Sequence, residues 1–299
     1  TSLFHLLCST AAMAALLAVM GLSTAHAASA YYDTSNASGL TPGAATWDAG
    51  TTPAWATSAT PGTADPGLWT NGNDAFFQTG GTNTVTISGT VIANSLTQTT
   101  NGTVTTISGG TLQLGLGGLA NTGNSALTIN SDVVLDASQN WNANVSTTTV
   151  NGAISGTGYS LRKIGAQTLV LTGANSYTGP TIIRAGTLQI GTATTGSVAG
   201  AYYMNGGNLN FARTDSYSVS NVVRGGTGTV TKSGAGTLTL TSANTYQSGT
   251  TISAGTLQLN NAKAAQNSVV TISATNGLAF GTGIGNFKPC FFLFFHHVT

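Results

Sequence analysis

The sequence predicts an all-β protein: a right-handed parallel β-helix (a β-solenoid) with an N-terminal capping segment and coils of about 21 to roughly 25 residues. Three observations support this prediction. They are a long internal duplication, a period-two alternation of apolar residues, and a composition rich in Gly (40 in the chain), with only 5% charged residues. Gly, Thr, Ser and Asn favour strands and turns over helices.

The duplication consists of two similar segments: residues 163–191, KIGAQTLVLTGANSYTGPTIIRAGTLQIG, and residues 232–260, KSGAGTLTLTSANTYQSGTTISAGTLQLN. The copies start at Lys163 and Lys232, and 17 of their 29 positions are identical without gaps. Each copy reads as short strands separated by turn residues. Two such copies in one chain indicate a repeat architecture, in which neighbouring units bury a core that one unit alone cannot bury.

Between residues 85 and 280 apolar residues alternate with polar ones in runs of four to six, as in TLVLTG and TLTLT, which is the signal of a half-buried strand. Turn residues mark a 21-residue step at Gly89, Gly110, Ser131 and Gly152. Later glycines continue this series with two longer steps, and we interpret the Ala-Asn-x-Tyr segments inside those steps as outward loops. In a parallel β-helix each strand pairs with its equivalent one turn later, about 4.8 Å away.

About 250 residues at this step predict roughly 12 coils. Matched apolar positions of the two copies should point into the core: Leu169 and Leu238, Leu171 and Leu240, Ile183 and Ile252, Leu188 and Leu257, and Ile190 and Leu259. An antiparallel sandwich is the alternative fold, but its turns would recur at shorter intervals, roughly every 8 to about 12 residues. The similarity of strands at offsets of whole coils favours the β-helix.

The chain divides into four segments by composition. Residues 1–27 carry a long run of apolar or small residues followed by A-x-A patterns, which predicts a signal peptide cleaved after Ala27 or Ala30. Residues 28–84 form the capping segment and residues 85–284 the β-helical repeats. Residues 285–299 have a Phe-rich composition unlike the rest, and we interpret them as a truncated or out-of-frame end.

The capping segment contains three of the four tryptophans, Trp47, Trp55 and Trp69. Terminal repeats of a stack are atypical because the first edge must be covered, so these rings are expected to close the end of the core. The alternative is a glycan-binding patch made by the three tryptophans with Asp48, since exposed aromatic rings beside a carboxylate suit sugar faces and hydroxyls.

Three polar positions recur in both copies of the duplication. Asn175 and Asn244 are interpreted as structural, either as turn residues or as side chains that bond the neighbouring loop backbone. Tyr177 and Tyr246 are expected to pack against the coil. Lys163 and Lys232, each two positions before a glycine, are interpreted as solvated turn charges.

Charge and residue usage exclude several functions. Lys and Arg number 8 against 7 acids, so the chain offers no basic face for nucleic acid. The body between residues 28 and 285 has no His, Cys or Glu, which excludes Ser-His-Asp and Cys-His sites and predicts no enzyme, metal or cofactor. Cys290, His296 and His297 could be proposed as a metal site, but three ligands on one short tail have no preformed geometry.

One enzymatic alternative stays open, a β-helical enzyme of the polysaccharide-lyase type. It would use carboxylates as Ca²⁺ ligands and a basic side chain to abstract a proton. The nearest candidates in the sequence are Asp132, Asp136, Arg162 and Lys163.

Both copies resemble the autotransporter-associated β-strand repeat, also called the passenger-associated transport repeat, and the opening YYDTSNASGLTPGAATWDAG is similar to the start of many proteins that carry it. The resemblance covers most of residues 31–260. It implies a β-helical passenger exported to the outer-membrane surface of a Gram-negative-type bacterium, with repeats that aid secretion and folding. It also implies a 12-stranded translocator barrel as partner, whose strands of about ten residues are absent from this sequence.

From these observations we expect a secreted or cell-surface passenger that serves as a scaffold or an adhesin-type protein. Surface glycans and host or neighbouring cells are further candidate partners. The alternatives are a carbohydrate-binding protein that uses the Trp-rich segment and the lyase-type enzyme.

Overall fold

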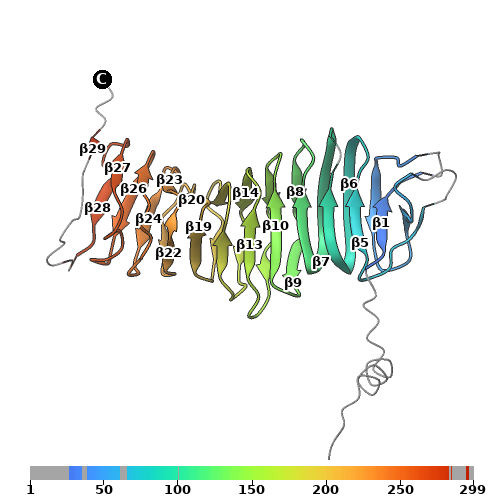
Figure 1. Ribbon diagram of the computed structural model, residues 1–299, viewed down its shortest axis with the longest axis horizontal. Helices are drawn as coiled ribbons and strands as arrows, with labels where there is room; N and C mark the ends of the chain where they lie inside the picture. The colour runs from blue at the N-terminus through green and yellow to red at the C-terminus, as the bar shows by residue number, and fades with distance from the viewer. Residues whose placement is uncertain are drawn as a thin grey trace, which may run out of the picture.

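The computed structural model describes residues 27–35, 39–60, 66–99, 101–282, 284 and 294–295. Within these ranges the chain forms an elongated β-solenoid of about ten turns with parallel stacked strands, which confirms the predicted fold class. Strands lie across the long axis, from β1 near one end to β28 and β29 at the other (Figure 1). No helix in the described ranges has the length and hydropathy needed to cross a membrane. The predicted signal peptide lies almost entirely outside them.

Each coil has three faces, named here first, second and third. Within a coil the chain runs along the second face, then the third and then the first. The first face contains β1 (Ser29–Tyr32), β5 (Asp74–Phe77), β10 (Gln139–Ala143), β13 (Leu161–Ile164), β16 (Thr181–Ile183), β19 (Tyr202–Asn205) and β22 (Val223–Thr227). The second contains β2 (Ala44–Trp47), β8 (Leu127–Ile129), β11 (Thr148–Val150), β14 (Thr168–Leu171), β17 (Thr187–Ile190), β20 (Asn208–Phe211), β23 (Val230–Lys232), β25 (Thr250–Ile252), β27 (Val270–Ile272) and β29 (Phe294–Phe295).

The third face contains β9 (Asp132–Leu135), β12 (Ile154–Ser155), β15 (Ala174–Asn175), β18 (Ser197–Val198), β21 (Tyr217–Val219), β24 (Thr237–Leu240), β26 (Thr256–Leu259) and β28 (Leu278–Phe280). Two long strands, β6 (Gly81–Gln98) and β7 (Thr103–Asn121), bend around all three faces and pair along most of their length. The structure therefore has about ten turns and not the twelve expected, because residues 27–80 do not form regular coils.

The coil length is set by the parallel register. Thr148 of β11 pairs with Leu169 of β14, and Leu169 in turn pairs with Leu188 of β17. Inward positions of successive strands therefore stack. All ten apolar residues expected in the core from the two copies are buried, with at most 2% of their surface exposed. Burial of such a column removes apolar surface from water at every turn, which drives the stacking.

The two copies of the duplication do not lie on the same face. On the first face, Leu161 stacks in register with Thr181, Tyr202 and Val223 of the next three turns. Val230 is the residue of the second copy that corresponds to Leu161, but it lies after the next corner, on the second face. The expectation that equivalent strands are separated by whole coils is therefore wrong. Three faces of similar length let the same sequence begin on any of them.

The Asn-x-Tyr segments are not outward loops, which corrects a second expectation. Asn175 lies on β15 in the wall of the coil, and Tyr177 is fully buried. The 21-residue glycine series continues from Gly152 to Gly173 at the same corner, whereas Gly186 lies at a different corner, between β16 and β17. The 34-residue step from Gly152 to Gly186 therefore connects two different corners of the coil and does not contain an inserted loop.

The N-terminal segment covers the first end of the solenoid with two short strands that pair in antiparallel fashion. β3 (Pro53–Ala56) pairs antiparallel with β1, and β4 (Gly67–Leu68) pairs antiparallel with β3. Trp47, Trp55 and Trp69 contact one another here, with ring centroids 4.7–4.9 Å apart. Tyr32 and Phe77 pack against Trp55, so this aromatic cap continues the core to its end.

Replacement of Leu188 by Ala should lower the free energy of unfolding by about 2–5 kcal/mol, because it leaves a cavity between two stacked coils. Chemical denaturation followed by circular dichroism measures this loss. Thr187→Ala, one position earlier and on the outward side, is the control and should cost well under that amount. Equal losses in the two variants would contradict the inward and outward assignment.

Candidate functional site

Lys163 and Lys232 form a matched pair of buried amines. The Lys163 side chain is 0% exposed, and its Nζ donates to the carbonyl oxygens of Ile164 (2.8 Å), Gly165 (2.7 Å) and Ala185 (3.1 Å). Lys232 donates to the equivalent carbonyl oxygens of Gly234 and Ala254. The prediction of solvated turn charges is wrong, because the corner carbonyls of two consecutive coils face inward and need donors.

Burial alters the acid–base behaviour of these amines. Removal from water lowers the pKa of Lys163 from 10.5 to about 8 and also lowers the pKa of Lys232. Three carbonyl acceptors match the three N–H donors of the Lys163 ammonium group, so its hydrogen-bonding capacity is satisfied. Each lysine therefore ties two coils together at a corner and is held away from any external substrate.

Asn175 and Asn244 take the place of backbone hydrogen bonds between coils. Asn175 Oδ1 accepts from Ile154 N (2.9 Å), while Nδ2 donates to the carbonyls of Gly173 (3.1 Å) and Ser197 (2.8 Å). Asn244 Oδ1 accepts from Val223 N (2.9 Å) and its Nδ2 donates to Ala264 O (2.8 Å). Of the two structural roles considered for these residues, the structure shows side chains that bond the neighbouring backbone.

Tyr177 and Tyr246 lie inside the coil, as expected. Each hydroxyl shares a hydrogen bond with the threonine that begins the next strand: Thr181 at 2.6 Å and Thr250 at 2.9 Å. Burial raises the pKa of both phenols above the ordinary value of 10. Neither ring is available as a binding platform.

The proposed glycan patch of the N-terminal segment is contradicted by burial. Trp47, Trp55 and Trp69 are at most 3% exposed, so no ring face is open to a sugar. Asp48 binds its own turn: it accepts from the backbone N–H and the hydroxyl of both Thr51 and Thr52, which lowers its pKa. The tryptophans pack inward against one another and cover the end of the core.

The residues considered for a lyase-type site do not converge. Asp132 and Asp136 lie exposed at opposite ends of β9, and Arg162 points outward from β13, whereas Lys163 is buried on the same strand. Among the residues that the structure describes, no three His, Cys, Asp or Glu side chains are grouped so that they could hold a metal ion. The candidate Cys290, His296 and His297 site lies outside the described ranges.

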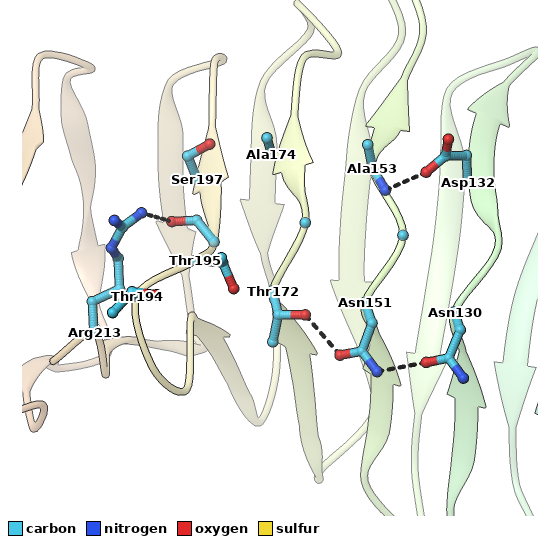
Figure 2. Close-up of a pocket in the computed structure, with 13 residues that line it drawn as sticks. Asn130, Asp132, Asn151, Ala153, Thr172, Ala174, Thr194, Thr195, Ser197 and Arg213 are labelled. Carbon is cyan, nitrogen blue, oxygen red and sulfur yellow. Dashed lines mark hydrogen bonds between the residues drawn. The ribbon is translucent and has the colours of Figure 1, made fainter. Parts of the chain in front are cut away.

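A polar groove of about 720 Å³ follows the corner between the second and third faces (Figure 2). Its second-face wall is a row of side chains from consecutive coils: Asn151 Nδ2 donates to Asn130 Oδ1 (2.7 Å), and Thr172 Oγ1 donates to Asn151 Oδ1 (2.6 Å). The floor needs glycine, since a Cβ on Gly152 would lie 1.9 Å from the Ser131 carbonyl oxygen.

The groove carries opposite charges at its two ends in Figure 2. Asp132 Oδ1 accepts from Ala153 N (2.9 Å) at one end. At the other end Arg213 donates to Asp215 through Nε (2.9 Å) and Nη2 (2.6 Å), and to Gly196 O through Nη1 (2.9 Å). The ion pair with Asp215 offsets the charge of Arg213, so the groove presents mainly hydroxyl and amide groups and little net charge. Its lining residues support hydrogen bonding and include no pair of nucleophile and base.

Sequence reasoning missed this groove, although a signal was present. Asn130, Asn151 and Thr172 each precede a corner residue of the 21-residue series, so their spacing places them in one row.

The passenger-associated transport repeat matches residues 161–190 and 230–259. No curated protein sequence and no solved structure matches the chain. Two segments that match the passenger-associated transport repeat, on a β-solenoid, are consistent with an autotransporter passenger in general.

The buried lysines and tyrosines should give stability a maximum between pH 8 and pH 10. Between pH 8 and pH 10.5 the Lys163 amine is still protonated in the unfolded chain but has lost its proton in the native state. The free energy of unfolding therefore rises with pH in this range because of Lys163, by about 1–2 kcal/mol. Above pH 10 the unfolded chain ionises tyrosines such as Tyr177 that remain protonated in the native state, so stability falls.

Urea unfolding at a series of pH values measures this profile. The Lys163→Met and Lys232→Met double variant should lose the rise, whereas Lys263→Met, at an exposed position, should keep it. A rise that persists in the double variant would rule out the buried lysines as its cause.

The Asn175→Asp variant should lose about 2–3 kcal/mol at neutral pH, because a carboxylate would face the Gly173 and Ser197 carbonyl oxygens without a donor. Denaturant titration measures the loss. Asn205→Asp, an exposed position at the end of β19, is the control and should change stability little.

Proposed function

We propose that this chain is a surface-displayed scaffold or adhesin-type passenger whose transport repeats act as folding units during export. The observation that carries the proposal is that each repeat copy closes a coil on itself. In the first copy β13 pairs with β16 and β14 with β17; in the second copy β23 pairs with β25 and β24 with β26.

The buried lysine joins the two ends of this coil. Lys163 bonds the corner carbonyl of Gly165 and that of Ala185 one turn later, and Lys232 bonds Gly234 and Ala254 in the same way. Each repeat is therefore a short segment that contains one complete set of pairings between two successive coils, and its outer strands also pair with the coils before and after it. Contacts that are local in sequence form faster than distant ones, because less chain entropy is lost before they form.

A closed coil then offers a paired edge on which the next coil can stack, so folding can proceed one coil at a time. Such stepwise folding suits a chain that emerges from a translocator barrel in the outer membrane, which we propose as its partner. The elongated shape and the polar, charge-poor exterior support a role as a stalk or adhesin-type surface on a Gram-negative-type bacterium.

Surface display tests the proposal. The chain, fused ahead of a translocator barrel, should become accessible to added protease on intact cells. The Lys163→Met and Lys232→Met double variant should be displayed several-fold less, because neither repeat can satisfy its corner carbonyls. Lys263→Met is the matched control. Equal display of the double variant and the control would refute the role of the repeats, and protection of all three from protease would refute surface display.

A further inference from the structure

We propose that the outward side of the second face binds an uncharged polysaccharide. The middle row of this side runs through ten paired strands and is polar except at Val170, which is buried: Thr84, Thr106, Thr128, Thr149, Val170, Gln189, Asn210, Thr231, Thr251 and Thr271. We call this side, with its flanking rows, the hydroxyl–amide face. Its groups repeat at the strand spacing of about 4.8 Å.

Within the described strands, the hydroxyl–amide face carries no outward ionisable side chain. Lys232 lies on a strand of this face but points inward and is buried. The exposed Arg224 belongs to a first-face strand, and Asp132 begins a third-face strand. A surface without charge gives no attraction to an anionic or cationic polymer and no desolvation penalty from its own ions. Its partner should therefore be neutral, and binding should not depend on salt.

The groups that the face offers match those of a sugar. Hydroxyl and primary amide groups each donate and accept hydrogen bonds, as sugar hydroxyls do, and threonine methyls can contact the C–H faces of sugar rings. In the part of the chain that the structure describes, the hydroxyls of Thr187, Thr229 and Thr231 bond no protein group. The same holds for Asn208 Nδ2, while its Oδ1 accepts from Thr229 N (2.8 Å).

A hollow of about 400 Å³ lies within this face, lined by Thr187, Asn208, Asn210, Thr229 and Thr231 from three successive coils. Its central amide is held in place from both sides: Asn210 Nδ2 donates to Gln189 Oε1 (3.2 Å), and Ser233 Oγ donates to Asn210 Oδ1 (2.8 Å). Groups that are already oriented lose less entropy on binding, so the hollow is the expected centre of contact.

Affinity on this face must come from repetition. From β6 to β27 the outward rows of this face contain no aromatic ring on which a sugar could stack, so each sugar contact is weak. A polymer that spans several coils binds through many such contacts at once, and its overall affinity exceeds that of one contact by orders of magnitude. The ligand is therefore a polysaccharide surface or strand and not a free sugar. The Asn130, Asn151 and Thr172 row of the corner groove extends the same chemistry along the edge of the face.

Retention on insoluble polysaccharides tests the proposal with the purified chain, so the result does not depend on the export pathway. The probes are cellulose, chitin, a β-1,3-glucan and starch as neutral polymers, with calcium pectate as an acidic one. We expect retention on at least one neutral polymer, unchanged between low salt and about 0.5 M salt. Retention on none of them, or only on pectate, overturns the proposal.

Substitutions locate the binding surface. Asn208→Ala removes the amide whose Nδ2 has no protein partner. Thr231→Lys places a charged side chain in the hollow. Each variant should weaken retention about tenfold or more. Ser218→Lys, at an exposed outward position on the third face, is the matched control and should bind as the unaltered chain does. Circular dichroism establishes that all variants are folded.

Two further outcomes would overturn the assignment. Equal retention of the two variants and the control would place binding elsewhere on the molecule. A dimer in sedimentation equilibrium that Thr231→Lys dissolves, with no polysaccharide retained, would identify a second copy of the chain as the occupant of this face.

Discussion

The rest of this structure depends on the stacking of each coil on the one before it. Parallel strands pair with the strands of the preceding turn, so every coil supplies the hydrogen-bond acceptors and the apolar surface that the next coil needs. Inward residues that lie one coil apart, such as Leu169 and Leu188, follow from that register. The corner glycines follow from it too, because at Gly152 the preceding backbone leaves no room for a side chain.

Corners are the places where stacking leaves polar groups without partners, and this chain fills them with polar side chains that reach inward. Lys163 and Lys232 donate to corner carbonyls, while Asn175 and Asn244 replace backbone bonds between neighbouring coils. A buried ammonium group is costly unless its donors are all satisfied. Recurrence of these residues at matched positions is therefore explained by the geometry of a closed coil.

The exterior of the solenoid divides by face. Charged side chains lie on the first and third faces and at corners, as with Arg224, Asp132 and the Arg213–Asp215 pair. The second face has hydroxyl and amide groups in rows that the core register aligns. A regular interior thus produces a regular exterior, and any ligand of this face would contact equivalent groups turn after turn.

The sequence by itself determined the fold class, the coil length and the apolar columns, because period-two alternation and a repeated segment leave few ways to bury the same residues. It did not determine which face each copy occupies, since three faces of similar length accept the same strand. Nor did it show that Lys163 and Lys232 are buried, because the carbonyls that they bond come from two coils. The inward position of Trp47, Trp55 and Trp69 and the polar groove at Asn130, Asn151 and Thr172 were decided by tertiary structure for the same reason: each depends on neighbours that the register brings together from separate turns.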